Sequence, residues 1–309
     1  MEIRDFGSTG LRVSVLGFGA SHIGADSVSE EEAGRALNAV LDLGVTLIDT
    51  ARGYGKSEER IGRHIAHRRG DFVLSSKCGY GVDGVADWTP ECITRGIDRA
   101  LATMQTDRID IMHFHSCPLA TLRSEDLVAA LLRAVEQGKV RVAAYSGEDA
   151  TGPRDPTPHD GHRESPRHHA IESGKFGSIQ TSINICDQRV IQDALPHCAG
   201  RGLGVIAKRP IANAFWRFAE RPVGDYSLPY WDRARAMNLA PPAGIPWPEL
   251  ALRFTAFTPH VHACIVGTAN MDHFRQNLAL LEKGPLPADV YTSIREAFRE
   301  NDDGWVGQV

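Results

Sequence analysis

Eight short runs of apolar residues recur along the chain, each with the length of a β-strand. Nearly all are followed by a stretch in which apolar residues return every three or four positions, as on the buried face of an amphipathic helix. Within the runs the apolar residues are continuous, which is typical of parallel strands buried on both faces. The predicted strands cover residues 13–18, 45–49, 72–76, 108–115, 140–146, 178–183, 203–208 and 263–266.

The helices between these strands have recognisable first and last residues. Ser29 precedes three glutamates, which is the pattern of a capping box, and Gly44 is a suitable residue to end that helix. Thr89 followed by Pro90 marks the start of another helix. The predicted helices cover residues 30–43, 57–66, 90–104, 125–138, 189–201, 246–257 and 271–281, with a further helix at 288–300.

Regular alternation of strand and helix along 309 residues predicts an α/β fold, the (β/α)8 TIM barrel. A β-hairpin over residues 2–12 precedes the barrel, and the helix at 288–300 is an extra element at its C-terminal end. The length also allows two domains, but one barrel fits, and residues 1–309 are interpreted as a single domain. The alternative fold is a doubly wound open sheet. Against it, the turn at 17–22 lacks the G-x-G-x-x-G pattern.

Residues 149–169 break the alternation. This stretch contains four prolines, four histidines and almost no apolar residue. Because a proline in a helix interior costs about 3 kcal/mol, no regular helix should cover it. We expect an irregular, mobile loop here and only a short helix near residues 170–173.

The composition limits the classes of protein to which the chain can belong. Hydrophobic residues make up 42% of the chain and charged residues 24%, as in ordinary globular proteins. The net charge of −5 indicates no basic surface for a nucleic acid, and no apolar run reaches the roughly 18 residues of a membrane span. The first residues lack the apolar core of a signal peptide and the six cysteines are scattered, so we expect a cytoplasmic protein with reduced thiols. The oligomeric state stays open.

Four polar residues lie at the ends of predicted strands or just beyond them: Asp49, Tyr54, Lys77 and His115. In a barrel these strand ends converge on one pocket. A tyrosine alone is a poor acid at neutral pH, but a nearby ammonium stabilises its phenolate. A carboxylate offsets the burial of the lysine, and a neutral imidazole can donate a hydrogen bond to a carbonyl oxygen. The four suit a site that protonates a developing oxyanion, and since none supplies hydride, a cofactor is implied.

Some of these residues also fit other interpretations. His113 lies two positions before His115, so both side chains should face the barrel interior and could be two metal ligands. No acidic or cysteine partner is evident in the sequence, and we expect no metal site. The four histidines of residues 149–169 fit a solvated loop better than a metal site. A barrel isomerase or lyase that needs no nicotinamide is another class of enzyme with similar polar residues.

Several motifs resemble those of the aldo-keto reductases, and the similarity extends over nearly the whole chain apart from residues 149–169. Residues 49–58 match the family signature D-T-A-x-x-Y-G-x-S-E, which is a specific pattern. Further similarities are the fourth strand with Asp110 and His115, the seventh-strand turn at 206–211, and the adenosine-phosphate segment at 265–268 with Asn277.

The resemblance implies an enzyme that uses NADP(H) to reduce a small aldehyde or ketone, or to oxidise the matching alcohol. Tyr54 would be the acid, Lys77 and Asp49 would adjust the pKa of Tyr54, and His115 would orient the carbonyl group. The residues that the resemblance assigns to the cofactor are Ser146 and Gln180, for the nicotinamide carboxamide, together with Gly19, Lys208, Arg209, Pro210, Gly267, Thr268, His273 and Asn277.

The chain departs from the family pattern at several positions. Gly147 replaces the usual Asn beside Ser146, and Lys208 stands where many members place an aromatic ring. Gly267 and His273 occupy positions where many members bind the 2′-phosphate through Lys and Arg. We therefore expect a modest preference for NADP(H), with NAD(H) as a second cofactor. The superfamily also contains potassium-channel β subunits, so a nucleotide-binding partner subunit with slow turnover is the alternative function.

Overall fold

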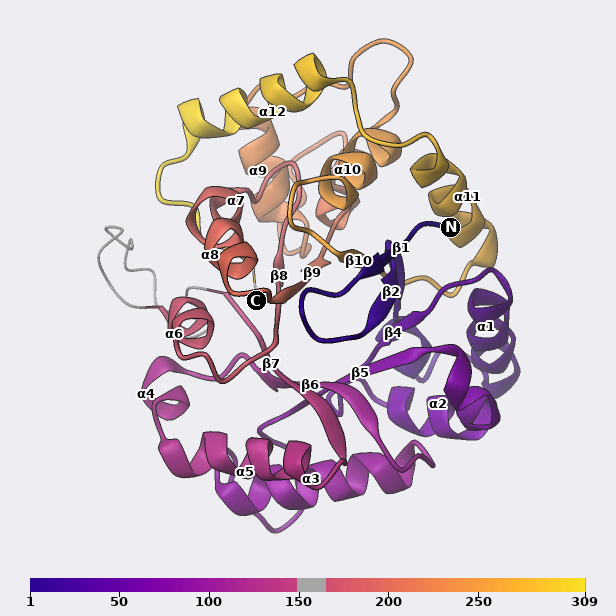
Figure 1. Cartoon of the computed structure of the whole chain (residues 1–309). Coiled ribbons are helices and arrows are strands. Elements are labelled where there is room, and N and C mark those ends of the chain that lie inside the picture. The colour runs from indigo at the N-terminus through magenta and orange to yellow at the C-terminus, as the bar shows by residue number, and fades with distance from the viewer. Residues whose placement is uncertain (149–164, 309) are drawn as a thin grey trace.

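The computed structural model describes residues 1–148 and 165–308, and its central element is a closed barrel of parallel strands (Figure 1). Neighbouring strands follow the order β10-β3-β4-β5-β6-β7-β8-β9, and helices surround them on the outside. This confirms the (β/α)8 barrel that the apolar pattern predicts. The barrel strands are β3 (Leu16–Gly19), β4 (Leu47–Asp49), β5 (Val73–Cys78), β6 (Ile109–His115), β7 (Val140–Ser146), β8 (Ser178–Ser182), β9 (Gly204–Lys208) and β10 (Ala263–Val266).

The helices that cover the barrel begin at the predicted caps. The Ser29 hydroxyl accepts a hydrogen bond from the Glu32 backbone N–H, and the Glu32 carboxylate accepts one from the Ser29 N–H, so the capping box forms. The extra C-terminal helix is α12 (Ala288–Asn301). The other covering helices are α1 (Glu30–Asp42), α2 (Ser57–Ile65), α3 (Pro90–Thr103), α5 (Glu125–Glu136), α10 (Trp247–Ala256) and α11 (Met271–Glu282). In the described part of the chain, no helix is long and apolar enough to cross a membrane.

Two predicted elements are divided in the structure. The apolar run at 13–18 is shared between β3 and the hairpin, because Val13 pairs with Arg4 of the first hairpin strand. The predicted helix at 189–201 is two short helices, because Pro196 has no N–H to continue the first one. The hairpin and short elements are β1 (Ile3–Asp5), β2 (Arg12–Ser14), η1 (His22–Gly24), η2 (Ala66–Asp71), α4 (Leu119–Leu122), α7 (Arg189–Asp193), α8 (Leu195–Gly200), η3 (Ala212–Arg217) and α9 (Leu228–Ala236).

The prediction of an irregular loop over residues 149–169 is wrong for its last residues, which belong to a helix. Residues 149–164 lie outside the described residues, whereas the helix that follows, α6 (Pro166–Glu172), begins earlier than expected. Pro166 is compatible with a helix here because it occupies the first turn, where its missing N–H is not needed. The Ser165 hydroxyl caps this turn by accepting a hydrogen bond from the His168 backbone N–H at 3.0 Å.

The hairpin closes the N-terminal end of the barrel and lies across the centre of the helix ring in Figure 1. Phe6 and Val13 belong to one buried apolar cluster with barrel residues such as Leu47 and Ile206. The fit is tight, since a Cβ atom at Gly204 would lie 2.4 Å from the Phe6 ring. Because this end is filled, a site for small molecules is expected at the other end, where the strands terminate.

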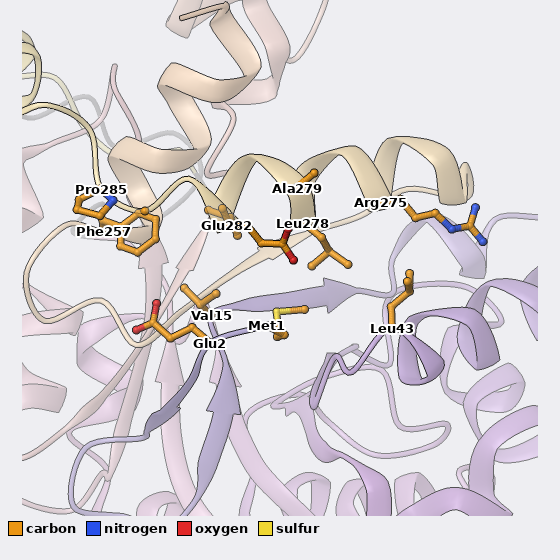
Figure 2. Close-up of a pocket in the computed structure, with 12 residues that line it drawn as sticks. Met1, Glu2, Val15, Leu43, Phe257, Arg275, Leu278, Ala279, Glu282 and Pro285 are labelled. Atoms are coloured by element: carbon orange, nitrogen blue, oxygen red, sulfur yellow. The ribbon is translucent and has the colours of Figure 1, made fainter.

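A pocket of about 560 Å³ lies on the outside of the barrel against α11 (Figure 2). Met1, Val15 and Leu278 contribute to its lining, and the Arg275 side chain lies toward one end of it. Val15 immediately precedes β3, so the pocket lies near the N-terminal end of that strand. None of the residues predicted to act on a substrate or cofactor lines it, and it is not the candidate active site.

Candidate active site

Three strands and one loop bring together the four residues predicted to be catalytic. Asp49 is the last residue of β4, Lys77 lies near the end of β5, and His115 is the last residue of β6. These strands are neighbours in the barrel. Tyr54 lies on the loop between β4 and α2, where its backbone N–H donates to the Ala51 carbonyl at 3.0 Å. The prediction that these side chains gather at one end of the barrel agrees with this arrangement.

The loop that carries Tyr54 is closely packed. Gly55 has a φ of +54°, and a Cβ atom there would lie 2.4 Å from the Gly24 carbonyl oxygen. The Ser57 hydroxyl donates to the Ala20 carbonyl at 2.9 Å and lies 2.7 Å from the Thr50 hydroxyl. Glycine and serine are therefore required by the backbone path, and this path fixes the position of the phenol.

Lys77 and Asp49 form a buried ion pair beneath the site. Lys77 Nζ lies 2.8 Å from Asp49 Oδ2 and donates to the Thr50 carbonyl at 2.7 Å, and the two side chains are 1% and 2% exposed. Burial opposes the charge of each group, but their mutual attraction outweighs it. As a result the pKa of Asp49 is lowered and the pKa of Lys77 is raised from their ordinary values. Both groups are charged at neutral pH.

The Tyr54 phenol lies over this buried cation. Its ring centre is 5.0 Å from Lys77 Nζ, and it meets the His115 ring edge to face with 6.1 Å between the centres. Tyr54 and His115 are partly exposed whereas Lys77 is buried, so the two rings face the barrel mouth. Burial and the Lys77 charge lower the pKa of His115 to about 3. The imidazole is therefore neutral at physiological pH and can act as a hydrogen-bond donor.

His113 also faces the barrel interior, as the strand alternation predicts, but it is fully buried. Its Nε2 lies 3.1 Å from the Ser75 hydroxyl, which donates its own proton to Asp49 Oδ1 at 2.7 Å. His113 Nε2 must therefore be the donor to Ser75. Burial and the Lys77 charge lower the pKa of His113 to about 3. This histidine supports the carboxylate of Asp49 and has no access to the barrel mouth.

A second tyrosine, Tyr80, reaches the site, although the sequence analysis does not single it out. Its hydroxyl oxygen lies 2.5 Å from His115 Nδ1, and the two rings stack with 5.5 Å between their centres. Tyr80 is on the loop that follows β5, between Gly79 and Gly81, whose φ angles are +130° and +73°. A tyrosine between two glycines directly after a barrel strand is the sequence signal that could have identified it.

Ser146 and Gln180, the residues predicted to hold the carboxamide, are connected to Asp49. The Ser146 hydroxyl donates to Gln180 Oε1 at 2.9 Å, and Gln180 Nε2 donates to Asp49 Oδ1 at 2.9 Å. The next residue, Gly147, has no room for a side chain, because a Cβ atom there would lie 2.4 Å from the Tyr145 hydroxyl oxygen. The usual Asn of the family does not fit here while Tyr145 keeps its position.

Lys208, at the end of β9, is paired with a buried carboxylate that the sequence analysis does not identify. Lys208 Nζ lies 3.2 Å from Oε1 of Glu148, which also accepts hydrogen bonds from the Thr181 hydroxyl at 2.9 Å and the Ser182 N–H at 2.7 Å. Arg167 approaches the same carboxylate at 3.5 Å. Burial lowers the pKa of Lys208, and Glu148 only partly opposes this. A phosphate at this position would compete with Glu148 for Lys208.

Arg209 and Pro210 continue the turn after β9. The Arg209 guanidinium lies 4.6 Å over the Tyr226 ring and hydrogen-bonds the hydroxyl of that tyrosine. Pro210 is buried, and its carbonyl accepts a hydrogen bond from the Thr255 hydroxyl of α10 at 3.0 Å. Pro210 therefore anchors the turn, and Arg209 carries its positive charge.

The remaining predicted cofactor residues lie on β3, β10 and α11. Gly19 pairs with Asp49 in the sheet, and a Cβ atom at Gly267 would lie 2.8 Å from the Gly19 carbonyl oxygen. The two glycines thus continue the site from Asp49 toward the start of α11. Thr268 precedes this helix and is partly buried, as is Asn277 in its interior, while His273 in its first turn is exposed.

The first turn of α11 is already capped from within the chain. The Asn270 side chain accepts hydrogen bonds from the backbone N–H groups of Asp272 and His273. Arg275, the next cation along the helix, pairs with Asp272 at 2.8 Å. An anion at this helix end would therefore meet few unopposed positive charges.

Within residues 1–148 and 165–308, no group of three or more His, Cys, Asp or Glu side chains is arranged to hold a metal ion. His159 and His162 of the histidine-rich stretch lie outside these ranges. His168 lies in α6 and packs edge to face on His197, with 5.8 Å between the ring centres.

The fold and the site define a class of protein, a (β/α)8 barrel with charged residues gathered at the C-terminal ends of its strands. A model of the aldo/keto reductase family matches residues 15–299. The chain belongs to the aldo/keto reductase family and is an oxidoreductase of that family.

Individual relatives resemble the chain along most of its length. The L-galactose dehydrogenase of Arabidopsis thaliana is 26% identical over 294 residues, which cover 90% of this chain and 88% of the relative. A probable voltage-gated potassium channel subunit beta of Oryza sativa subsp. japonica is 27% identical, with 93% of each chain covered. The holo form of an aldo-keto reductase from Bacillus halodurans shares the fold, with a TM-score of 0.80, 24% identity and 96% of each chain covered.

Proposed function

We propose that this chain catalyses the NADP(H)-dependent reduction of a small aldehyde or ketone, or the oxidation of the matching alcohol. The observation that carries the proposal is the buried Lys77–Asp49 pair directly beneath the Tyr54 ring, with the neutral His115 beside it. A buried ion pair adds little net stability to a fold, because desolvation offsets the attraction. A charged lysine under a phenol stabilises the phenolate, and this stabilisation is needed when that phenol must release a proton.

The chain's own residues would act on the substrate oxygen. In the reducing direction, His115 donates a hydrogen bond to the carbonyl oxygen, and the Tyr54 hydroxyl gives its proton to that oxygen as negative charge develops. Lys77 stabilises the phenolate that remains, and Asp49 keeps Lys77 charged and in position. In the oxidising direction the Tyr54 phenolate takes the alcohol proton. When bound, the nicotinamide supplies or accepts the hydride.

The residues around the four proposed catalytic side chains fit a nicotinamide nucleotide. Ser146 and Gln180 offer a hydroxyl and an amide beside Asp49, and a carboxamide needs both donors and acceptors. Gly19 and Gly267 lie against each other and leave a stretch without side chains beside Asp49. The start of α11 would face the adenosine phosphate, with Thr268, His273 and Asn277 nearby. We propose NADP(H) as the main cofactor, with a modest preference over NAD(H).

The proposal is tested by following the oxidation of NADPH and of NADH with a panel of small aldehydes, ketones and aldoses, and the reverse reaction with the matching alcohols. Aldoses are included because one relative is an L-galactose dehydrogenase. We expect sustained turnover of at least one class of carbonyl compound with NADPH. Tight NADPH binding with no turnover across the panel would contradict the reductase proposal, and no binding of either nucleotide would contradict the cofactor.

The second candidate is a nucleotide-binding partner subunit with slow turnover. It is favoured by the 27% identity to a probable potassium-channel subunit beta over 93% of the chain. Rapid mixing of the NADPH complex with an active carbonyl compound separates the two candidates. A single turnover followed by slow exchange of the nucleotide favours the partner subunit, whereas repeated turnover favours the enzyme.

A further inference from the structure

Tyr80 is fixed against His115 by the loop that carries it. The carbonyl of Gly79 accepts a hydrogen bond from the Trp88 backbone N–H at 2.7 Å, and a Cβ atom at Gly79 would lie 2.3 Å from the Trp88 ring. The Tyr80 ring meets the Trp88 ring edge to face, with 6.2 Å between the centres, and also stacks on His115. The 2.5 Å contact between the Tyr80 hydroxyl and His115 Nδ1 is therefore built into the fold.

The Tyr80 hydroxyl and the neutral His115 ring carry one proton each, and these two protons can be arranged in two ways. Burial and the neighbouring Tyr54 raise the pKa of Tyr80, so its hydroxyl stays protonated. Burial and the Lys77 charge lower the pKa of His115 to about 3, so the neutral ring carries a proton on one nitrogen only. Either the hydroxyl donates to Nδ1 and the ring proton is on Nε2, or Nδ1–H donates to the hydroxyl oxygen and Nε2 has a lone pair.

The two arrangements present opposite groups to a substrate. A carbonyl oxygen only accepts hydrogen bonds, so it requires a proton on Nε2. Among the residues that the structure describes, His115 Nε2 makes no hydrogen bond, and the ring is partly exposed. Nε2 is thus the nitrogen left for a ligand, and the Tyr80 hydroxyl occupies the other one.

We propose that Tyr80 is a positioning residue that holds His115 in the Nε2–H tautomer by donating its hydroxyl proton to Nδ1. This inference rests on the proposed function, because it specifies the group that His115 presents to the carbonyl oxygen. Tyr80 does not touch the substrate oxygen in this scheme. It acts by making one of two otherwise similar ring states the stable one.

The tautomer can be measured without any turnover. Nitrogen-15 NMR spectra of the full chain with labelled histidine rings distinguish pyridine-type from pyrrole-type nitrogens, and a His115→Gln variant identifies the His115 signals. We expect a pyridine-type Nδ1 and a pyrrole-type Nε2 in the wild type, and a loss of this preference in Tyr80→Phe. A pyrrole-type Nδ1 in the wild type, or an unchanged tautomer in Tyr80→Phe, would overturn the proposal. This readout remains valid even if the chain reduces no carbonyl compound, so the two proposals can fail separately.

Kinetics supply the second test. We expect Tyr80→Phe to lower kcat about 10- to 100-fold, as for the partial loss of an oriented donor, with the Kd for NADPH within about twofold of wild type. In a His115→Gln background the same change should alter kcat less than about twofold, because no tautomer remains to be selected. Tyr291→Phe is the matched control, since it removes a hydroxyl that contacts Thr258 at 3.3 Å outside the site. Equal losses from Tyr80→Phe in both backgrounds would contradict the proposed role.

Discussion

Asp49 connects the parts of the candidate site through its two carboxylate oxygens. Oδ2 accepts a hydrogen bond from Lys77, whereas Oδ1 accepts from Ser75 and Gln180. One side chain therefore links the lysine proposed to support proton transfer to the amide proposed to hold the nicotinamide. A change at Asp49 should affect catalysis and cofactor binding together, while a change at Tyr54 should affect catalysis alone.

Tyr54→Phe tests the proposed acid. The substitution removes only the hydroxyl and keeps the ring over Lys77, so the packing of the loop should survive. We expect kcat to fall by a factor on the order of 10² to 10⁴, the usual contribution of a general acid. The Kd for NADPH, measured by fluorescence titration, should stay close to wild type. Turnover of a carbonyl substrate at about the wild-type rate would show that another group supplies the proton.

Lys77→Met tests the buried ion pair through stability. Removing one partner leaves the Asp49 carboxylate buried without a cation, and such changes typically cost about 3–5 kcal/mol of unfolding free energy. In the wild type, where the pKa of Asp49 is lowered, its contribution is present at neutral pH and is lost only as the pH falls through that lowered pKa. In the variant, burial alone should raise the pKa of Asp49, so the folded state loses stability as the pH rises.

The difference between wild type and Lys77→Met should therefore be larger at about pH 8 than at about pH 5, as measured by urea unfolding. The Asp49→Asn/Lys77→Met double variant is the control, because it has no carboxylate at position 49 and its difference from wild type should change less with pH. An equal destabilisation by Lys77→Met at both pH values would refute the assigned ion-pair energetics.

Sequence reasoning locates Asp49, Lys77 and His115 because each lies at or near the end of an apolar strand, and barrel geometry then brings them together. Their catalytic roles remain predictions. Tyr80 and Glu148 lie just beyond the ends of strands, and no periodic pattern governs such positions. The glycines around Tyr80 mark its position in the sequence, but the partners of both residues depend on the path of a loop and on side chains from other strands. Only the three-dimensional structure reveals these partners.

At the scale of elements, the start of α11 is the place where cofactor preference should be decided. A helix start favours anions, but here the Asn270 side chain already accepts hydrogen bonds from the N–H groups of Asp272 and His273. Arg275 is paired with Asp272. A 2′-phosphate would therefore gain less binding free energy at this helix start than from a guanidinium that is free to form a bidentate contact.

We expect the wild type to bind NADPH more tightly than NADH by about 5- to 150-fold, which corresponds to about 1–3 kcal/mol. His273→Arg should lower the Kd for NADPH by a further factor of about 5 to 50 and leave the Kd for NADH unchanged, because only the phosphate gains a contact. Ala279→Arg adds the same charge farther along α11 and serves as the control. Tighter binding of NADH than of NADPH by the wild type would overturn the assignment of NADP(H) to this helix start. An equal effect of both variants on the Kd for NADPH would overturn it as well.

Element boundaries follow the sequence where caps and breakers are explicit, as at Ser29 and Thr89. Proline explains the two clearest differences, because its effect depends on its position within a turn. Pro166 begins α6 in a stretch whose composition predicts a loop, while Pro196 divides a stretch whose periodicity predicts one helix. Composition and periodicity average over several residues, so neither distinguishes a proline in a first turn from one in a helix interior.

At the scale of the whole molecule, the two ends of the barrel have different roles. The N-terminal end is filled by the hairpin and by Phe6, which packs where Gly204 leaves space. The other end carries the polar side chains of the candidate site. Substitutions at the filled N-terminal end should therefore change stability without changing the chemistry.

Phe6→Ala tests this separation. Emptying a fully buried aromatic site typically costs about 3–5 kcal/mol. We propose that residues 1–309 form one domain, so this stability should be lost in a single cooperative transition. The Kd for NADPH at low temperature should change by less than about twofold, because Phe6 lies at the far end of the barrel. Calorimetry and nucleotide titration on the same preparation check both expectations. Two separate transitions, or a large loss of affinity without unfolding, would contradict them.

Gly147 and Tyr145 also constrain which substitutions each position can accept. While Tyr145 occupies its buried position, an Asn at residue 147 would overlap its ring, and the Tyr145 hydroxyl is held by the Cys117 carbonyl at 3.3 Å. A side chain at residue 147 and the Tyr145 ring in its present position therefore exclude each other. We therefore expect the two positions to be epistatic, with the cost of Asn at residue 147 depending on whether Tyr145 is present. While Tyr145 is in place, no side chain at residue 147 can be accommodated without a shift of the tyrosine ring.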